Sequence, residues 1–402
     1  MRDRRGIACD GASFVSRVGA SGKGPAPGAV HAGAPPLPRL GAAIAGLPWY
    51  AGRGDCWVRA FIECLRCARE EHQETMARKH PDVPFVIDFH THMLDDELRQ
   101  ICTHRNAITG FGQKTAQASA DLRKFLDPQV QIADMDERGI DMHVVFTGPV
   151  YMSTWWADAP TALELTRRMN QIVADWVRRY PTRFVGTATL PMQDIGMAAS
   201  ELRRCVSEHG HKAVMLPTNV DGAYLGERKF WPLWEAIRDL DIPVFIHPEG
   251  IRDPWYHRFA LWNSLGQSIE EAKVMASMIY EGLLDAIPGL KVVVAHGGGY
   301  FPTYMGRLDR NILKPEAVAN IKGKPSDYLR HFYYDTCVYD GLALEMLFRR
   351  VGADRIVLGA DYPVGDVDPV GVVKEAVTLP KPELAMVAAG TAARLLGITV
   401  PT

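Results

Sequence analysis

The chain has 402 residues, of which 47% are hydrophobic, and its formal net charge is −2. These values allow a large globular core and exclude the strong basic bias of a protein that binds nucleic acid or a membrane surface. No apolar run reaches the roughly 20 residues that a membrane-spanning helix needs, so we expect a small molecule as the partner, and neither nucleic acid nor a membrane.

Residues 1 to about 75 differ from the rest of the chain. They are rich in Gly, Ala, Pro and Arg and show no sustained helix or strand period, so we expect a disordered or non-native extension outside the catalytic domain. A targeting peptide is one alternative, which the Pro and Gly content of residues 20–47 disfavours. Translation from Met76, just before the first strand, is the interpretation we favour.

Cysteine usage points to a reducing compartment such as the cytoplasm. The seven cysteines are scattered and odd in number, which is not the pattern of a disulfide framework. Cys64 and Cys67 form one close pair, but a lone CxxC is a weak signal for a metal or redox site.

The first predicted strand, Phe85 to His90, runs into the sequence Asp88-Phe-His-Thr-His92. Alternate residues of an extended chain point to the same face, so Asp88, His90 and His92 are expected to share one side. The strand is then either an exposed edge strand with two surface histidines or part of a metal site.

From Pro84 onward, short apolar runs alternate with longer amphipathic ones, which is typical of a parallel sheet with helices between its strands. Eight strands are predicted, at Phe85–His90, Asp141–Phe146, Phe184–Leu190, Ala213–Leu216, Val244–His247, Lys291–His296, Phe332–Asp335 and Ile356–Gly359. Helices are predicted at Ala162–Tyr180, Ala198–Glu208, Phe230–Leu240, Ser268–Ala286 and Gly341–Arg350. This count favours a (β/α)8 TIM barrel formed by residues 76–402.

Potential metal ligands lie at the ends of four predicted strands. His90 and His92 close the first strand, and His247 and His296 close the fifth and sixth. Asp361 follows the eighth strand, so all of these residues fall at the carboxyl end of the barrel, where such folds build their sites. A single strand-end histidine is often only a satisfied polar residue, but their joint placement favours a catalytic Zn²⁺ site with one open position.

These residues carry a resemblance to a known family. The motifs resemble those of the amidohydrolase superfamily, in the branch of aminocarboxymuconate-semialdehyde decarboxylase and related nonoxidative decarboxylases: Val86-Ile-Asp-Phe-His-Thr-His92, Phe245-Ile-His-Pro248, Ala295-His-Gly-Gly-Gly-Tyr-Phe-Pro302 and Leu358-Gly-Ala-Asp-Tyr-Pro363. The resemblance implies a TIM barrel of the metal-dependent hydrolase type with one divalent ion per subunit, Zn²⁺ or alternatively Mn²⁺. It implies that His296 acts as acid/base and that the metal ligands are His90, His92, His247 and Asp361.

The resemblance also implies a homodimer. In it Arg307, on the helix after the sixth strand, would cross the interface and bind the substrate carboxylate in the neighbouring subunit. The alternative is that Arg307 pairs with Asp309 on the surface of its own helix.

The substrate side departs from the family pattern. Glu249 stands where the family decarboxylase has an aromatic residue after His-Pro, so it is either a substrate-binding residue or a rim residue in a surface ion pair. In the loop after the first strand no basic residue clearly matches the family's substrate-binding one; the candidates are Arg105, Lys114 and Arg123. Four tryptophans either wall a planar substrate or only pack the loops: Trp155, Trp156, Trp255 and Trp262.

Together with these features, the resemblance implies a zinc-dependent nonoxidative decarboxylase of aromatic compound catabolism, acting on a carboxylated aromatic or muconate-semialdehyde-type substrate. The ion and an arginine would stabilise negative charge, and His296 or Asp361 would return the proton to carbon. A metal-dependent hydrolase or hydratase acting on a ring-cleavage product would use the same residues. A barrel that zinc only stabilises is the third alternative, against which an acid/base histidine beside the ligands argues.

Overall fold

One large sheet of parallel strands lies at the centre of the residues that this computed structural model describes, 79–103 and 122–401. Its strand order, β1-β2-β3-β4-β7-β8-β9-β10, follows the chain, and each strand pairs in parallel with the next. The strands are β1 (Ile87–Met93), β2 (Met142–Thr147), β3 (Phe184–Ala188), β4 (Ala213–Leu216), β7 (Val244–Ile246), β8 (Val292–Val294), β9 (Phe332–Asp335) and β10 (Ile356–Val357). The predicted extension 1–75 with its Cys64–Cys67 pair, Arg105 and Lys114 lie outside the described residues.

Hydrogen bonds between β1 and the segment that follows β10 close the sheet. The Phe89 N–H donates to the Leu358 carbonyl at 2.8 Å. The Tyr362 N–H donates to the His90 carbonyl at 3.0 Å, and the His92 N–H donates back to the Tyr362 carbonyl at 2.9 Å. The predicted (β/α)8 barrel is therefore confirmed.

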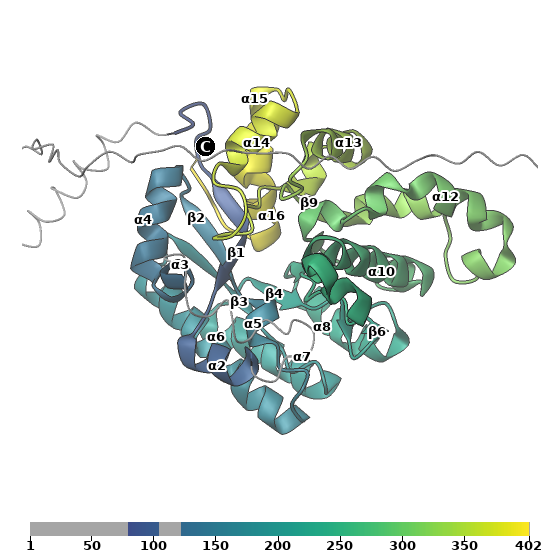
Figure 1. The fold of residues 1–402 in the computed structure, drawn as a ribbon, viewed down its shortest axis with the longest axis horizontal. Coiled ribbons are helices and arrows are strands. Elements are labelled where there is room, and N and C mark those ends of the chain that lie inside the picture. The colour runs from purple at the N-terminus through teal and green to yellow at the C-terminus, as the bar shows by residue number, and fades with distance from the viewer. Residues whose placement is uncertain (1–78, 104–121, 402) are drawn as a thin grey trace, which may run out of the picture. The chain divides into compact units, whose positions relative to one another are not determined.

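Helices surround the barrel (Figure 1). On the helix Ala159–Arg179 the residues Leu165, Met169 and Val173 are buried, because apolar side chains four positions apart line one face of a helix. Between the strands or after the last one lie α2 (Asp96–Thr103), α3 (Leu122–Leu126), α4 (Pro128–Arg138), α5 (Pro149–Met152), α6 (Ala159–Arg179), α7 (Ile195–Arg204), α8 (Trp231–Asp239), α9 (Leu261–Ser264), α10 (Gly266–Tyr280), α11 (Leu283–Ala286), α12 (Met305–Arg310), α13 (Gly341–Val351), α14 (Pro369–Ala376), α15 (Lys381–Ala385) and α16 (Thr391–Leu396). Among the described residues, no helix has both the length and the apolar character needed to cross a membrane.

The strands bury both of their faces, as expected for a parallel sheet covered by helices. Inside the barrel, the rings of Phe89, Phe146 and Phe245 lie with centroids 4.6–6.1 Å apart. Val145, between two inward-facing residues of β2, instead belongs to the core that the strands share with the helices. This packing fixes the strand ends that carry the polar residues.

Several local features differ from the prediction. The strand expected to reach His296 ends at Val294, because His296 takes a left-handed backbone conformation (φ 50°) and begins a turn. The helix expected over Ser268–Ala286 is divided into α10 and α11 at Gly282, whose φ of 76° ends a regular helix. A small hairpin of β5 (Asn219–Val220) and β6 (Ala223–Tyr224) was not predicted.

An irregularity in β1 interrupts the expected alternation of its side chains. The pairing with β2 shifts register between Asp88 and Thr91. An extra residue of this kind re-aims the side chains that follow it. As a result Asp88 lies 3.8 Å from His143 and accepts hydrogen bonds from the N–H groups of His90 and Ala360, rather than joining the histidines.

Candidate metal centre

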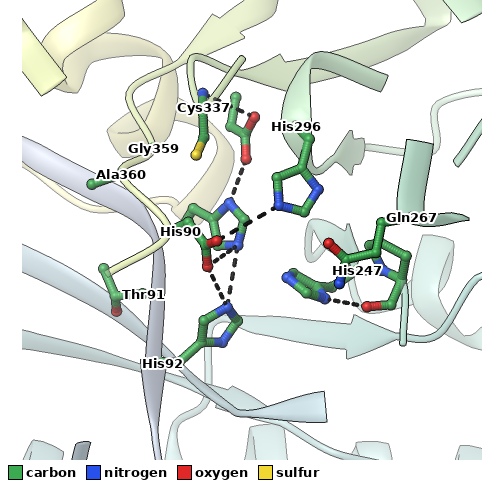
Figure 2. Close-up of polar contacts among 12 residues, drawn as sticks. His90, Thr91, His92, His247, Gln267, His296, Cys337, Gly359 and Ala360 are labelled. Atoms are coloured by element: carbon green, nitrogen blue, oxygen red, sulfur yellow. Dashed lines mark hydrogen bonds and ion pairs between the residues drawn. The ribbon is translucent and has the colours of Figure 1, made fainter. Parts of the chain in front are cut away.

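Four side chains from three distant parts of the chain meet at the carboxyl end of the barrel. His90 and His92 come from β1, His247 follows β7 and Asp361 follows β10. One ligand atom from each lies within 4.8 Å of those of the other three. Figure 2 shows the rings of His90, His92 and His247 turned toward one another. The sequence prediction thus named a set of residues that the fold does bring together.

The donor atoms suit a divalent cation. The Nε2 atoms of His90 and His92 lie 3.2 Å apart. The Nδ1 atoms of His90 and His247 face acceptors, Asp335 Oδ2 at 2.6 Å and the Pro248 carbonyl at 2.8 Å, so these rings carry their hydrogen on Nδ1 and present a lone pair at Nε2. His247 Nε2 is buried and has no hydrogen-bond partner within the described part of the chain. Three imidazole nitrogens and a carboxylate fit Zn²⁺ or Mn²⁺.

The surroundings of the centre favour the metal-binding forms of His92, His247 and Asp361 but favour a proton on His90. Desolvation lowers the pKa of both His92 and His247, which keeps their rings neutral. Desolvation raises the pKa of Asp361, but the charge of His90 and hydrogen bonds from the histidines outweigh it and hold this pKa well below its usual value. Desolvation also lowers the pKa of His90, yet the charges of Asp361 and Asp335 raise it to about 9. A cation that binds between His90 and Asp361 therefore replaces a proton.

His296 lies beside this set without belonging to it. Its ring centroid is 5.2 Å from that of His90, and its Nε2 is 3.8 Å from Asp361 Oδ2. Its Nδ1 lies 2.5 Å from Glu271 Oε1. Desolvation lowers the pKa of His296, but the negative charges of Glu271 and Asp361 raise it well above the usual value. The cavity next to His296 and Asp361 is also lined by Asn263, Ser264, Gln267, Ser268, Gly299 and Tyr339.

Glu249 lies two residues after His247, in a second cavity at the same end of the barrel. Desolvation raises the pKa of Glu249 to about 7, although the polar groups of Ser153 and Trp155 and the charge of Arg252 lower it. No ion pair joins Glu249 to a residue within ranges 79–103 and 122–401, so the predicted surface pair is not found there. The same cavity is lined by Thr147, Met152, Leu190, Met215, Asn219 and Val220.

The other candidates for substrate binding are spread over the surface and the loops. Arg307 is exposed on α12, and Asp309 accepts a hydrogen bond from the Ser326 N–H at 2.9 Å instead of pairing with Arg307. Arg123 forms an exposed ion pair with Asp127 at 3.7 Å. Of the four tryptophans, Trp155 lines the Glu249 cavity and Trp156 donates a hydrogen bond to the Ser153 carbonyl at 2.8 Å. Trp255 lies in the short 3-10 helix Pro254–Ala260, and Trp262 is buried in α9.

Residues 87–398 match the family model described as amidohydrolase. The chain belongs to the amidohydrolase family. A curated relative, 2-amino-3-carboxymuconate-6-semialdehyde decarboxylase of Dictyostelium discoideum, is 35% identical over 240 residues, which is 59% of this chain and 67% of that protein. The solved 5-carboxyvanillate decarboxylase of Sphingomonas paucimobilis has a TM-score of 0.70 at 27% identity and covers 79% of this chain and 100% of its own. A dihydroxybenzoic acid decarboxylase of Polaromonas sp. JS666, solved with manganese and 2-nitroresorcinol, has a TM-score of 0.67 at 27% identity, with 78% and 97% covered.

Sequence reasoning missed two buried acids of this amidohydrolase. Asp335 is the last residue of β9 and contacts His90; its place at a strand end is the same signal that identified the histidines. Glu271 lies within α10 and contacts His296, and nothing in its local sequence distinguishes it from Glu270 beside it.

Proposed function

We propose that this amidohydrolase is a metal-dependent nonoxidative decarboxylase of a carboxylated aromatic or muconate-semialdehyde-type substrate. The observation that carries the proposal is the placement of His296 Nε2, 3.8 Å from Asp361 Oδ2, at the edge of a three-histidine, one-carboxylate set. A proton donor or acceptor is thereby held next to a cation site. The similarity to proteins named as decarboxylases supports the same reaction.

His90, His92, His247 and Asp361 would hold the ion, with Zn²⁺ proposed first because imidazole nitrogen and carboxylate oxygen are its usual ligands. Mn²⁺ is the alternative, supported by the manganese in the Polaromonas structure. When bound, the ion neutralises the negative charge of a substrate carboxylate and of the carbon that loses it.

The chain's own residues supply the proton. When the bond between carbon and carboxylate breaks, CO₂ leaves and the electron pair stays on the carbon, which must then take up a proton. His296 is proposed to deliver it from Nε2, because Nδ1 is occupied by Glu271. Asp361 Oδ2, on the same side of the centre, is the next candidate.

Glu249 is proposed to contact the substrate on the side away from its reacting carboxylate. Its cavity combines apolar walls such as Met152 and Met215 with the polar groups of Thr147 and Asn219, which suits a planar ring with a hydroxyl or amino substituent.

We further propose that the working unit is a homodimer in which Arg307 completes the partner's site. Arg307 is exposed and has no ion-pair or hydrogen-bond partner in the portion of the chain that the structure describes. Exposed apolar side chains flank it: Tyr300, Tyr304, Ile312 and Leu313. A guanidinium binds a carboxylate by two parallel hydrogen bonds, which fixes the orientation of the leaving group.

A reducing compartment such as the cytoplasm suits the free thiols of Cys102, Cys205 and Cys337.

The test is release of CO₂ by the metal-loaded protein from a panel of hydroxybenzoates, carboxyvanillate and carboxymuconate semialdehydes. His296→Ala should keep its metal and lose about 10²-fold or more in turnover. Turnover without CO₂ would establish a hydrolase or hydratase instead. Full metal content without turnover of any compound would favour a structural ion.

A further inference from the structure

Glu271 is a buried carboxylate that packs against the back of His296. It lies in the second turn of α10, and its side chain is fully buried. Its Oε1 is 2.5 Å from His296 Nδ1, the ring nitrogen that points away from Asp361. His296 therefore sits between two acids, one at each ring nitrogen.

Packing alone does not explain this carboxylate. Removing a charge from water costs several kcal/mol unless hydrogen bonds or an opposite charge offset the loss. Its neighbour Glu270 meets that condition with hydrogen bonds from Asn219, Tyr224 and Lys273 at 2.8–3.0 Å. Glu271 meets it only in part, because its Oε2 is buried and has no hydrogen-bond partner among residues 79–103 and 122–401. The contact with His296 is thus the one hydrogen bond of the Glu271 carboxylate within the described residues.

The turn that carries His296 is shaped to reach α10. Gly299 has a φ of 60°, and a Cβ placed on it would lie 2.4 Å from the Ser268 carbonyl and 2.8 Å from Glu271 Oε2. Only glycine allows the backbone to approach the helix so closely at this point. His296 itself has a φ of 50°, so its ring direction depends on this turn and on the contact with Glu271 rather than on the preceding strand.

We propose that Glu271 is the positioning residue for His296. It accepts the Nδ1–H hydrogen bond, fixes the tautomer whose Nε2 faces the reacting centre, and stabilises the imidazolium that holds the proton before transfer. The direction of that transfer, from Nε2 to carbon, rests on the proposed decarboxylation. The hydrogen bond and the tautomer do not depend on which reaction the enzyme catalyses.

The first test is kinetic. Glu271→Gln keeps the shape of the side chain but removes its charge, and it should lower kcat about 10²-fold or more, leaving KM and metal content unchanged. Combined with His296→Ala it should cause no further loss, because residues that act as a unit are not additive. Glu281→Gln makes the same acid-to-amide change at the other end of α10 and should leave kcat unchanged. Normal kcat in Glu271→Gln, or an additive loss in the double variant, would overturn the proposal.

The second test does not depend on turnover. In the metal-loaded protein with ¹⁵N-labelled histidine, the His296 resonances should report a protonated Nδ1, and Glu271→Gln should change that pattern without changing those of His92 or His247. An unchanged His296 spectrum would overturn the role of Glu271 even if the enzyme decarboxylates. A changed spectrum in a protein that releases no CO₂ would uphold it and contradict the proposed reaction. If Glu271→Gln does not fold, Glu271→Asp withdraws the carboxylate by one methylene and should give the same loss in kcat at normal KM.

Discussion

Replacing Asp335 with asparagine should weaken metal binding while the barrel stays folded. The side chain of Asp335 is fully buried at the end of β9. Its Oδ2 lies 2.6 Å from His90 Nδ1, and its Oδ1 accepts from the N–H groups of Gly297 at 2.9 Å and Cys337 at 3.3 Å. Both oxygens therefore face hydrogen-bond donors, which a carboxylate can satisfy together.

An amide cannot satisfy all of these donors. If its oxygen faces Gly297 and Cys337, its NH₂ group faces His90 and drives the ring proton to Nε2, the atom that the ion needs. If its oxygen faces His90, the two backbone donors lose their acceptor, at about 1–3 kcal/mol for each buried group. Changes to a residue that orients a metal ligand through a hydrogen bond cost about 10- to 100-fold in metal affinity, or roughly 1.4–2.8 kcal/mol.

The measurement is competition for Zn²⁺ between the metal-free protein and a coloured chelator, with thermal unfolding recorded in parallel. Asp335→Asn should raise the metal Kd by about 10- to 100-fold. Asp354→Asn, which removes an ion pair of 2.9 Å with Arg330 at the surface, is the matched control and should leave Kd unchanged. A Kd in Asp335→Asn equal to that of the unmodified protein would refute the argument that the carboxylate fixes the His90 tautomer.

Three further outcomes are expected. The double variant with His90 and His92 replaced by alanine should hold far less than one equivalent of metal by elemental analysis. A stoichiometric metal content in that variant would contradict the proposed site. A chain that begins at Met76 should match the full chain in kcat and melting temperature; a drop of several degrees would mean that the extension packs on the barrel. Mixing inactive Arg307→Ala and His296→Ala subunits should restore part of the activity, since one mixed site then has both residues intact, and no recovery after verified exchange would exclude a shared site.

The architecture could be predicted from periodicity because the strands of the barrel are short, most of them are rich in apolar residues, and they alternate with amphipathic helices. The predicted β4 and β9 have the observed ends, Ala213–Leu216 and Phe332–Asp335. The predicted elements extend beyond the observed ones where the backbone leaves its regular conformation. The eighth strand was extended to Gly359 but ends at Val357, because the following residues hydrogen-bond to β1 and to the segment around Val387. Local sequence does not contain such long-range contacts.

The meeting of the four proposed metal ligands was predictable because the fold brings strand ends together, and the family resemblance separated these ligands from His296. Asp335 and Glu271, the two acids that contact His90 and His296, were harder to predict. Asp335 could have been found by the same rule, since it closes β9. Glu271 belongs to a helix and reaches His296 across 25 residues of sequence, so only the packing of α10 on the turn after β8 reveals it.

The backbone at His296 and Asp361, the two proposed proton carriers, shows why the residues around them matter. His296 and Asp361 have φ values of 50° and 55°, a conformation that costs an ordinary residue about 1–2 kcal/mol. At Asp361 the cost is offset where its carbonyl accepts the N–H groups of Val364 and Gly365, both at 2.9 Å. A Cβ at Gly365 would lie 2.0 Å from the Ala360 carbonyl, so this turn depends on glycine there. The direction of both side chains therefore depends on neighbouring residues as well as on the strands that precede them, and substitutions at those neighbours should lower turnover.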